Sequence, residues 1–246
     1  MSFYVYNLRG NNPYFNLAFE EYILSEYPKN DADIFLIFYE NADSLILGRN
    51  LVKSQEVYSH KSTPPVIRRA SGGGSVAHFP GNLNFGVIIN VNAYPVYKHI
   101  TKSYELILAC VARSISGKLP VTQGGVSDLC INSASGQKKI SGNSQVRKKN
   151  WLLHHGTLLY DIANVPKISH FLKHPPKEPD YRKGRHHKDF LVSYIPHTDK
   201  SALISKLIRE FAKEFSQIPS MKKIPETLRI SAVEYLNSHL SHRFRC

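Results

Sequence analysis

Two arginines and three consecutive glycines stand together in the segment RRASGGGSVAHFPGN, Arg68 to Asn82. Glycine lets backbone N–H groups approach a ligand closely, and arginine adds positive charge. The combination predicts a loop that binds an anion, with phosphate as the first candidate. The alternative is a glycine-rich turn with incidental arginines. The spacing differs from the GxxxxGK[ST] phosphate loop, because no lysine follows the second glycine.

The same loop contains G-x-G-x-x-A, as Gly72, Gly74 and Ala77, which is a degenerate dinucleotide-binding fingerprint. That motif requires a helix to begin at the glycines. The chain continues instead with HFPGNLNFGVII, whose proline, glycine and β-branched residues predict a turn and a strand. The loop is therefore expected to connect two strands.

Two further segments carry residues that could do chemistry. SDLCINSASGQKKISGNSQ supplies Asp128 and Lys139, and WLLHHGTLL supplies His154 and His155. A single lysine is usually solvated. Neighbouring residues of a strand point to opposite faces, so the two histidines are a poor joint metal site.

Composition limits the class of protein. The chain has 246 residues, 42% of them hydrophobic, and a formal net charge of +13, which fits one large globular domain with an anionic partner. Nucleic acid is the less favoured partner, because no zinc-finger spacing or RNP-type motif accompanies the charge. The three cysteines suit a reducing cytosol. The sequence shows no secretory signal and no apolar run of the ~20 residues that a membrane span needs. We therefore expect a cytoplasmic protein.

The elements that must position these residues follow from periodicity and caps. A first helix should begin at Pro13 with Asn12 as its cap, and an amphipathic helix should follow Asp199. Two short apolar runs, 33–40 and 43–49, are expected to form a hairpin. The other expected strands cover 65–70, 82–91, 128–132, 138–145 and 151–161, and the other helices cover 102–116 and 227–240. The sum predicts an α+β fold with mixed, mostly antiparallel sheets flanked by helices.

In combination, RRASGGGSVAHFPGNLNF, KKISGNSQ and LLHHGTLL resemble the lipoate-protein ligase A family of the biotin/lipoyl ligase and octanoyltransferase superfamily. PYFNLAFEEYIL, NADSLILGRN and GRHHKDFLVSYI match the same family, so the resemblance covers residues 3 to 215. It implies the biotin/lipoyl protein ligase catalytic-domain fold. We expect residues 1–246 to form one such domain, with 217–246 as a short helical appendix and without the family's large C-terminal accessory domain.

The resemblance implies an enzyme that activates lipoate with ATP and Mg²⁺ to lipoyl-AMP. The lipoyl group then passes to a lysine of a lipoyl acceptor domain, in 2-oxoacid dehydrogenase complexes or in the glycine cleavage H protein. Such acceptor domains are usually acidic, so the basic surplus would steer their approach. A partner role for nucleic acid or a membrane is not expected.

The family motifs also imply residue roles. Lys139 is the catalytic lysine that bridges the acyl carbonyl and the phosphate, and Asp128 is the metal ligand. The nucleotide would be bound by Arg69, Gly74, Ser75, Val76, Ala77 and Lys139. The acyl substrate and the remaining pocket would be bound by Ser71, Gly72, Gly73, His78, Asn82, Ser141, Gly142, His155, Gly156 and Thr157. NLNFGVII and LILG are expected to form the apolar slot for the lipoyl chain.

Two alternatives remain at this stage. Octanoyltransferases of the superfamily form a thioester on a cysteine, but Cys130 occupies an apolar strand position and is expected to be an inert, buried thiol. The second alternative is a lipoyl or octanoyl transferase that uses a preformed activated donor, or that needs a separate accessory subunit for adenylation.

Overall fold

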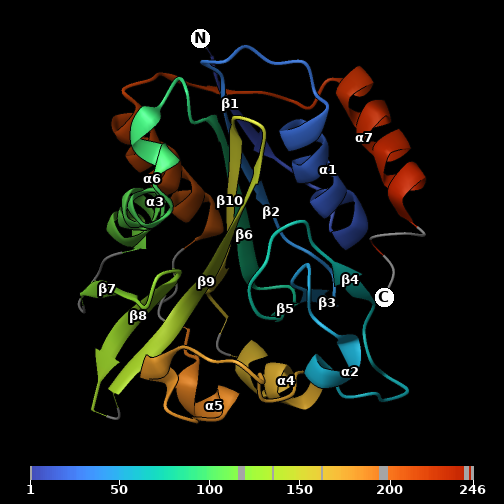
Figure 1. Ribbon diagram of the computed structural model, residues 1–246, viewed down its shortest axis with the longest axis vertical. Coiled ribbons are helices and arrows are strands. Elements are labelled where there is room, and N and C mark those ends of the chain that lie inside the picture. The colour runs from blue at the N-terminus through green and yellow to red at the C-terminus, as the bar shows by residue number, and fades with distance from the viewer. Residues whose placement is uncertain are drawn as a thin grey trace.

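The computed structural model describes residues 2–115, 120–134, 136–161, 163–193, 199–240 and 244. Within these ranges the strands form an eight-stranded sheet, in the order β11-β1-β2-β6-β10-β9-β8-β7, and a three-stranded sheet, in the order β4-β3-β5 (Figure 1). The strands are β1 (Phe3–Asn7), β2 (Ile34–Tyr39), β3 (Ser44–Leu47), β4 (Val66–Arg68), β5 (Val76–His78), β6 (Asn82–Asn90), β7 (Val121–Gly124), β8 (Asp128–Ser133), β9 (Gly136–Lys148), β10 (Trp151–Leu159) and β11 (Pro219–Met221).

The large sheet is mixed but mostly antiparallel, as the sequence predicts. β6 pairs antiparallel with both β2 and β10, and β10 pairs antiparallel with β9, whereas β1 pairs parallel with β2 and β11. In this register His155 lies opposite Gly86 and Thr157 lies opposite Asn84. Every residue of β6 is buried, because both faces of the sheet are covered.

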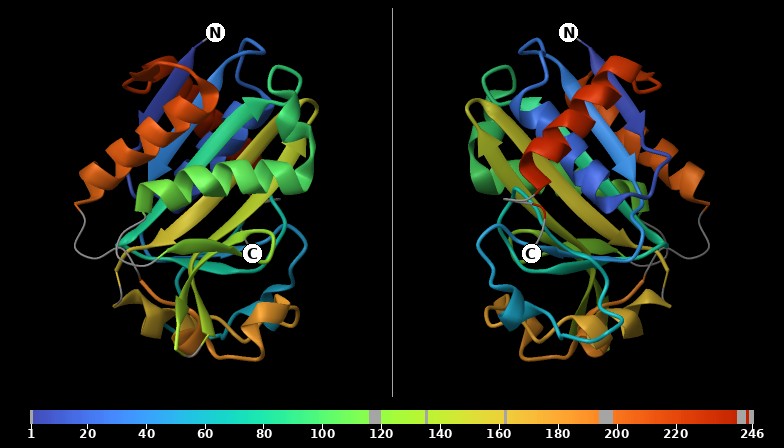
Figure 2. Two further views of the ribbon diagram at one scale, coloured as in Figure 1. Left: turned by 90° about the vertical axis from the view of Figure 1, so that its left-hand side faces the viewer. Right: turned by 90° about the vertical axis from the view of Figure 1, so that its right-hand side faces the viewer.

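Helices cover the two faces of the large sheet (Figures 1 and 2). On one face, α1 (Pro13–Ser25) and α7 (Glu226–His239) pack together, and on the other α3 (Ile100–Ile115) packs on α6 (Lys200–Phe215). Alternate residues of β2 point to each layer, so Leu36 joins the α3–α6 core and Ile37 joins the α1 core. The shorter helices are α2 (Lys53–Glu56), η1 (Pro95–Lys98), α4 (Asn164–Phe171), η2 (Asp180–Arg182) and α5 (His187–Phe190). None of the helices in the described ranges has the length and apolarity to cross a membrane.

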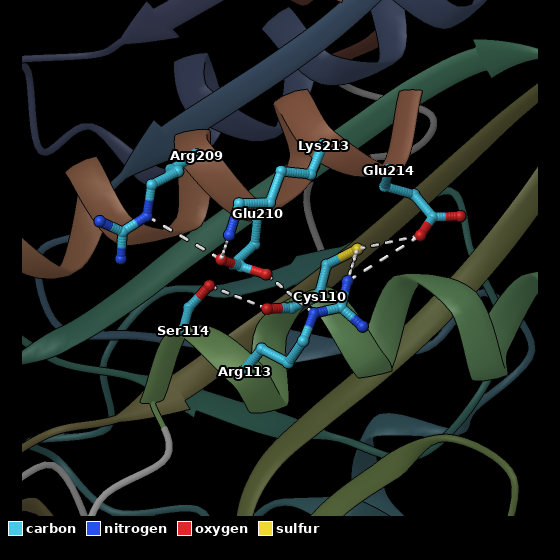
Figure 3. A network of polar contacts seen from close by, with 7 residues as sticks. All are labelled: Cys110, Arg113, Ser114, Arg209, Glu210, Lys213 and Glu214. Atoms are coloured by element: carbon cyan, nitrogen blue, oxygen red, sulfur yellow. Dashed lines mark hydrogen bonds and ion pairs between the residues drawn. The ribbon is translucent and has the colours of Figure 1, made fainter. Parts of the chain in front are cut away.

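A polar seam joins α3 to α6 (Figure 3). Glu210 accepts hydrogen bonds from Arg113 Nε and Lys213 Nζ, both at 2.8 Å. Cys110 Sγ lies 3.8 Å from Glu214 Oε2, and burial, followed by the charge of Glu214, raises the pKa of this thiol to about 12. The thiol is therefore protonated at neutral pH, and the seam is a structural feature of the helix layer.

The expected hairpin of residues 33–40 and 43–49 is wrong. β2 lies between β1 and β6 in the large sheet, whereas β3 lies between β4 and β5 in the small sheet. Every residue of both strands is buried, so neither strand has a polar face that would indicate its partner. The glycine segment also contains a strand of its own, because β5 pairs antiparallel with β3. The loop proper therefore spans residues 69–75.

Asn12 caps α1 as expected, since its side chain accepts hydrogen bonds from the backbone N–H groups of Tyr14 and Phe15. We predict that Asn12→Ala lowers the free energy of unfolding by about 1 kcal/mol, because two helix N–H groups lose their acceptor. Urea denaturation followed by circular dichroism measures the change. Asn11→Ala, next to the cap, is the control and should change the free energy by much less. Equal losses in the two variants would contradict the capping role.

Candidate functional site

A cavity of about 260 Å³ lies where the glycine loop, β9, β10 and the segment 172–191 meet. Most of the residues that the sequence predicts for the site line it. They are Arg69, Gly73, Gly74, Ser75, Val76, Ala77, His78, Asp128, Lys139, Gly142, His155, Gly156 and Thr157. Segments more than a hundred residues apart in the sequence thus contribute to one cavity.

Four predicted residues lie behind this wall. Ser71 and Ser141 are buried, and Gly72 accepts a hydrogen bond from Ser144 Oγ at 2.9 Å through its carbonyl. Asn82 donates to the carbonyl of Ala77 at 3.1 Å and so fixes the turn between β5 and β6. In the described structure these side chains and carbonyls support the wall and do not face the cavity.

The guanidinium of Arg69 holds the glycine loop. Its Nε donates to Ser71 Oγ at 2.9 Å, and its Nη2 donates to the carbonyls of Gly72 and Gly74 at 2.5 and 2.8 Å. Burial lowers the pKa of Arg69 to about 10, which leaves it charged at neutral pH. No carboxylate of the described residues forms an ion pair with it. The cavity wall therefore carries a positive charge with no carboxylate in direct contact, which favours an anionic ligand.

The loop also packs very closely on the end of β3. Gly73 has φ +83°, a conformation that glycine adopts without strain. A Cβ atom on Gly48 would lie 2.0 Å from the carbonyl oxygen of Gly73. Glycine is thus required on both sides of this contact, which holds the loop against the end of β3.

Lys139 and Asp128 form an ion pair on the opposite wall. Lys139 Nζ lies 3.0 Å from Asp128 Oδ1, and the hydroxyl of Tyr181 donates to Asp128 Oδ2 at 2.5 Å. Burial, followed by the negative charge of Asp128, raises the pKa of Tyr181, so the phenol is a proton donor at neutral pH. A Cβ atom on Gly142 would come within 2.9 Å of Lys139 Nζ. Glycine at this position therefore leaves room for the ammonium group.

His78 belongs to a buried chain of neutral hydrogen bonds. Asn41 Nδ2 lies 2.8 Å from His78 Nδ1, and His78 Nε2 lies 3.0 Å from Thr157 Oγ1, which donates to Asn84 Oδ1 at 2.8 Å. Burial, followed by the charge of Arg69, lowers the pKa of His78 to about 3. The imidazole is therefore neutral near pH 7 and orients Thr157.

The two neighbouring histidines of β10 point to opposite faces, as predicted. His155 lines the cavity, whereas His154 is fully buried against Tyr104 on the α3 side. Burial lowers the pKa of His154 to about 3. The described residues contain no group of three or more His, Cys, Asp or Glu side chains placed to hold a metal ion.

Several lining residues were not anticipated from the sequence. Glu56 accepts a hydrogen bond from Ser75 Oγ at 2.8 Å, and Tyr39 forms part of the wall. The basic segment, KHPPKEPDYRKGRHHKD at residues 173–189, supplies Lys173, Lys177, Arg182 and His187. Its charge density was the available signal, but sequence alone could not show that it lies beside the glycine loop.

The apolar part of the cavity differs from the expected slot. Ile46, from LILG, lines it together with Leu17, Leu159, Ile168 and Leu172. No residue of NLNFGVII lines the cavity. The reason is that β6 is central in the large sheet, where its side chains pack under α1 and α3.

Comparison with known proteins identifies the family. A model described as the lipoyl protein ligase A/B catalytic domain matches residues 12–216. The probable lipoate-protein ligase A of Mycoplasma genitalium is 35% identical over 167 residues, which make up 65% of this chain and 46% of that protein. Lipoate–protein ligase 1 of Staphylococcus aureus is 32% identical over 176 residues, 70% of this chain and 50% of that protein. The chain thus spans about half the length of the curated relatives it matches.

Solved structures share the fold over nearly the whole chain. A bipartite lipoate protein ligase of Thermoplasma acidophilum, studied with its E2 lipoyl domain, has a TM-score of 0.77 at 23% identity and covers 98% of this chain and 93% of its own. A lipoate-protein ligase A bound with ATP has a TM-score of 0.76 at 23% identity, with coverage of 99% and 97%. The predicted fold class is confirmed.

Cys130 is fully buried on β8, and burial raises the pKa of its thiol. The thiolate, which is the reactive form, is therefore scarce at neutral pH. We predict that iodoacetamide modifies Cys130 far more slowly at pH 7.5 in the folded protein than in urea. Mass spectrometry of tryptic peptides over time gives both rates. Comparable rates in the two states would show an accessible, reactive thiol and would revive a thioester mechanism.

Proposed function

Because the chain belongs to the lipoyl protein ligase A/B catalytic domain family, we propose that it is a lipoate-protein ligase. It would activate lipoate with ATP to lipoyl-AMP and transfer the lipoyl group to an acceptor lysine. One observation carries the proposal: a cavity with apolar side chains at one part of its wall has two buried or half-buried cationic side chains, Arg69 and Lys139, at another. A fatty acid and a phosphate joined to each other would match this distribution.

The first step joins two anions, so the site must reduce their repulsion. A lipoate carboxylate oxygen would attack the α-phosphorus of ATP, and pyrophosphate would leave. Arg69 and the segment Gly74–Ala77 would bind the nucleotide, with Ser71, Gly72 and Gly73 shaping the loop. Lys139 would leave Asp128 and contact the acyl carbonyl and the α-phosphate as a compact point charge.

The second step forms an amide bond. The neutral amine of the acceptor lysine would attack the acyl carbonyl of lipoyl-AMP, and AMP would leave. Within this scheme the protein aligns the two substrates and forms no covalent bond to them. The burial of Cys130 agrees with a reaction that uses no thioester.

Mg²⁺ would bind at Asp128. A single carboxylate is a suitable protein ligand, because Mg²⁺ at phosphate sites is commonly bound by one or two carboxylates and by phosphate oxygens. Both carboxylate oxygens of Asp128 accept hydrogen bonds or an ion pair in the described structure, so the site fits the metal only if Lys139 moves toward the substrates. Mg²⁺ would supply positive charge at the nucleotide phosphates.

The acceptor would be a small acidic lipoyl domain, of a 2-oxoacid dehydrogenase complex or of the glycine cleavage system. The bipartite ligase of Thermoplasma acidophilum was studied with its E2 lipoyl domain, which supports this class. The basic segment at the cavity, with Lys173 and Lys177 in its wall, offers charge complementarity. The reaction would take place in the cytoplasm, where ATP is available.

A transferase that uses preformed lipoyl-AMP, or one that needs an accessory subunit, is the competing proposal. The two are separated by incubating the purified chain with ATP, Mg²⁺ and lipoate, without acceptor, and by looking for lipoyl-AMP. Its formation supports the ligase. If no lipoyl-AMP forms, but the chain transfers the lipoyl group from supplied lipoyl-AMP to an acceptor domain, the result supports the transferase.

We predict that Lys139→Ala lowers the rate of lipoyl-AMP formation by about 100-fold or more, because the α-phosphate and the carbonyl lose a shared positive charge. Lys138→Ala is the matched control, since Lys138 is the preceding residue of β9 and does not line the cavity. The assay is release of pyrophosphate. A Lys139→Ala enzyme as fast as the control would remove Lys139 from its proposed role.

We further predict that Asp128→Asn raises the Mg²⁺ concentration for half-maximal activation at least about tenfold, because the metal loses its anionic ligand. Asp180→Asn is the control, because Asp180 is an exposed carboxylate next to Tyr181. A Mg²⁺ titration of the adenylation rate measures both variants. An unchanged midpoint for Asp128→Asn would place the metal elsewhere.

A further inference from the structure

A chain of hydrogen bonds connects α1 to the glycine loop through the inside of the molecule. Glu20 Oε2 lies 2.9 Å from His155 Nδ1, and His155 Nε2 lies 2.6 Å from Ser71 Oγ. Ser71 Oγ in turn accepts from Arg69 Nε at 2.9 Å. Glu20 lies within PYFNLAFEEYIL, a segment that matches the family, but the sequence motifs imply no role for it. It lies on α1 and does not line the cavity.

The chemistry of Arg69 and Glu20, at the two ends of this series of hydrogen bonds, fixes the direction of donation along it. A guanidinium can only donate and a carboxylate can only accept. Since Ser71 Oγ accepts from Arg69, its own hydrogen is available for His155 Nε2. His155 then carries its hydrogen on Nδ1 and donates it to Glu20. For a neutral imidazole, this direction of donation corresponds to the tautomer with Nδ1–H.

All four side chains are withdrawn from water. The exposed fractions are 1% for Glu20 and Ser71, 7% for Arg69 and 8% for His155. A buried carboxylate needs hydrogen-bond donors or an opposite charge, and here the opposite charge lies at the far end of the chain. The polar chain therefore links the two charges that the interior would otherwise leave isolated.

The large sheet is shaped to admit Glu20. Gly86 lies opposite His155 in the register of β6 and β10, and a Cβ atom on Gly86 would lie 2.4 Å from Glu20 Oε1. Any other residue at this position would place its Cβ atom against Glu20 Oε1 and force the carboxylate to shift. The glycine is thus a second part of the same arrangement.

Arg69, at the other end of this series of hydrogen bonds, determines the orientation of the glycine loop. Arg69 Nη2 binds the carbonyls of Gly72 and Gly74. In a trans peptide the C=O and the following N–H point in opposite directions. The N–H groups of Gly73 and Ser75 therefore point away from Arg69, and both residues line the cavity. Two backbone donors are presented together because one guanidinium holds the two carbonyls.

We propose that Glu20 is a positioning residue for the phosphate-binding loop. Through His155 and Ser71 it fixes Arg69, and thereby holds the N–H groups of Gly73 and Ser75 in the orientation that an anion requires. The inference rests on the proposed nucleotide-binding role of this loop, but the hydrogen-bond chain can be tested without turnover.

The variant is Glu20→Gln, which keeps the size of the side chain and removes its charge. A glutamine amide can donate to Nδ1, so the Nε2–H tautomer of His155 becomes accessible and Ser71 Oγ then faces two donors. The ¹⁵N imidazole spectrum of the ligand-free protein reports the tautomer. We expect Nδ1–H for His155 in the wild type and a shift toward Nε2–H in Glu20→Gln. Hydrogen exchange of residues 69–76 should be about tenfold faster, as for the loss of a hydrogen bond to a charged group.

Two further variants make the test specific. Ser71→Ala removes only the hydroxyl that connects His155 to Arg69, and should speed up loop exchange to a similar extent while leaving Glu20 and His155 paired. In the double variant the two effects should not add, because both interrupt one chain. Glu210→Gln removes a buried carboxylate of equal size from the α3–α6 seam (Figure 3), and should change neither the spectrum of His155 nor the exchange of the loop.

Nucleotide binding completes the experiment. The Kd of ATP, measured by calorimetry without lipoate, should rise about tenfold in Glu20→Gln and in Ser71→Ala and stay unchanged in Glu210→Gln. An unaltered His155 tautomer and loop exchange in Glu20→Gln, or additive effects in the double variant, would overturn the proposal. A protein that binds no ATP at all would instead refute the proposed function, while the spectra and the exchange data would still decide the role of Glu20. If Glu20→Gln does not fold, Ser71→Ala decides: wild-type loop exchange in that variant would equally overturn the proposal.

Discussion

The burial of one guanidinium constrains the rest of the site. Arg69 has no carboxylate partner among the described residues, so its hydrogen-bond donors must be satisfied by neutral groups. The glycine loop meets that requirement by curling its carbonyls inward, and only glycine permits the left-handed turn and the close contact with Gly48. Satisfying a buried cation and exposing amide N–H groups are therefore two results of the same local conformation.

On the opposite wall the cationic side chain is paired with a carboxylate. Lys139 is only half-buried and is neutralised by Asp128, which also holds Tyr181 of the basic segment. One wall thus carries a buried guanidinium with no ion-pair partner among the described residues, and the other carries a lysine paired with a carboxylate. Asp128 is buried, so when Lys139 turns toward a substrate anion this carboxylate needs another positive charge. This asymmetry suits a reaction in which Arg69 helps to bind a nucleotide and Lys139 moves to the negative charge that develops as the bond forms.

Local chemistry explains which features the sequence could predict. The caps Asn12 and Asp199, the four-residue spacing of apolar side chains in α6 and the alternation at His154 and His155 are visible within a few residues. Glu20 and Gly86 are not, because their meaning depends on a register between strands and a helix far apart in the chain. The hairpin prediction failed for a related reason: strands buried on both faces, such as β2 and β3, lack the polar alternation that would identify their sheet. The motifs that resemble the family located most of the cavity wall, whereas only the three-dimensional structure showed which residues support that wall.

The pairing of β1 with β11 has a consequence for biosynthesis. β1 begins at Phe3, yet its outer edge is covered only by Pro219–Met221, which pair with it in parallel. On the ribosome the edge of β1 must remain uncovered until Pro219–Met221 have emerged. An uncovered strand edge is a template for pairing with other chains, so the nascent protein is exposed to misassembly during that interval. The brevity of β11 and the proline at its start limit the ability of that last strand to recruit a neighbour once the sheet is complete.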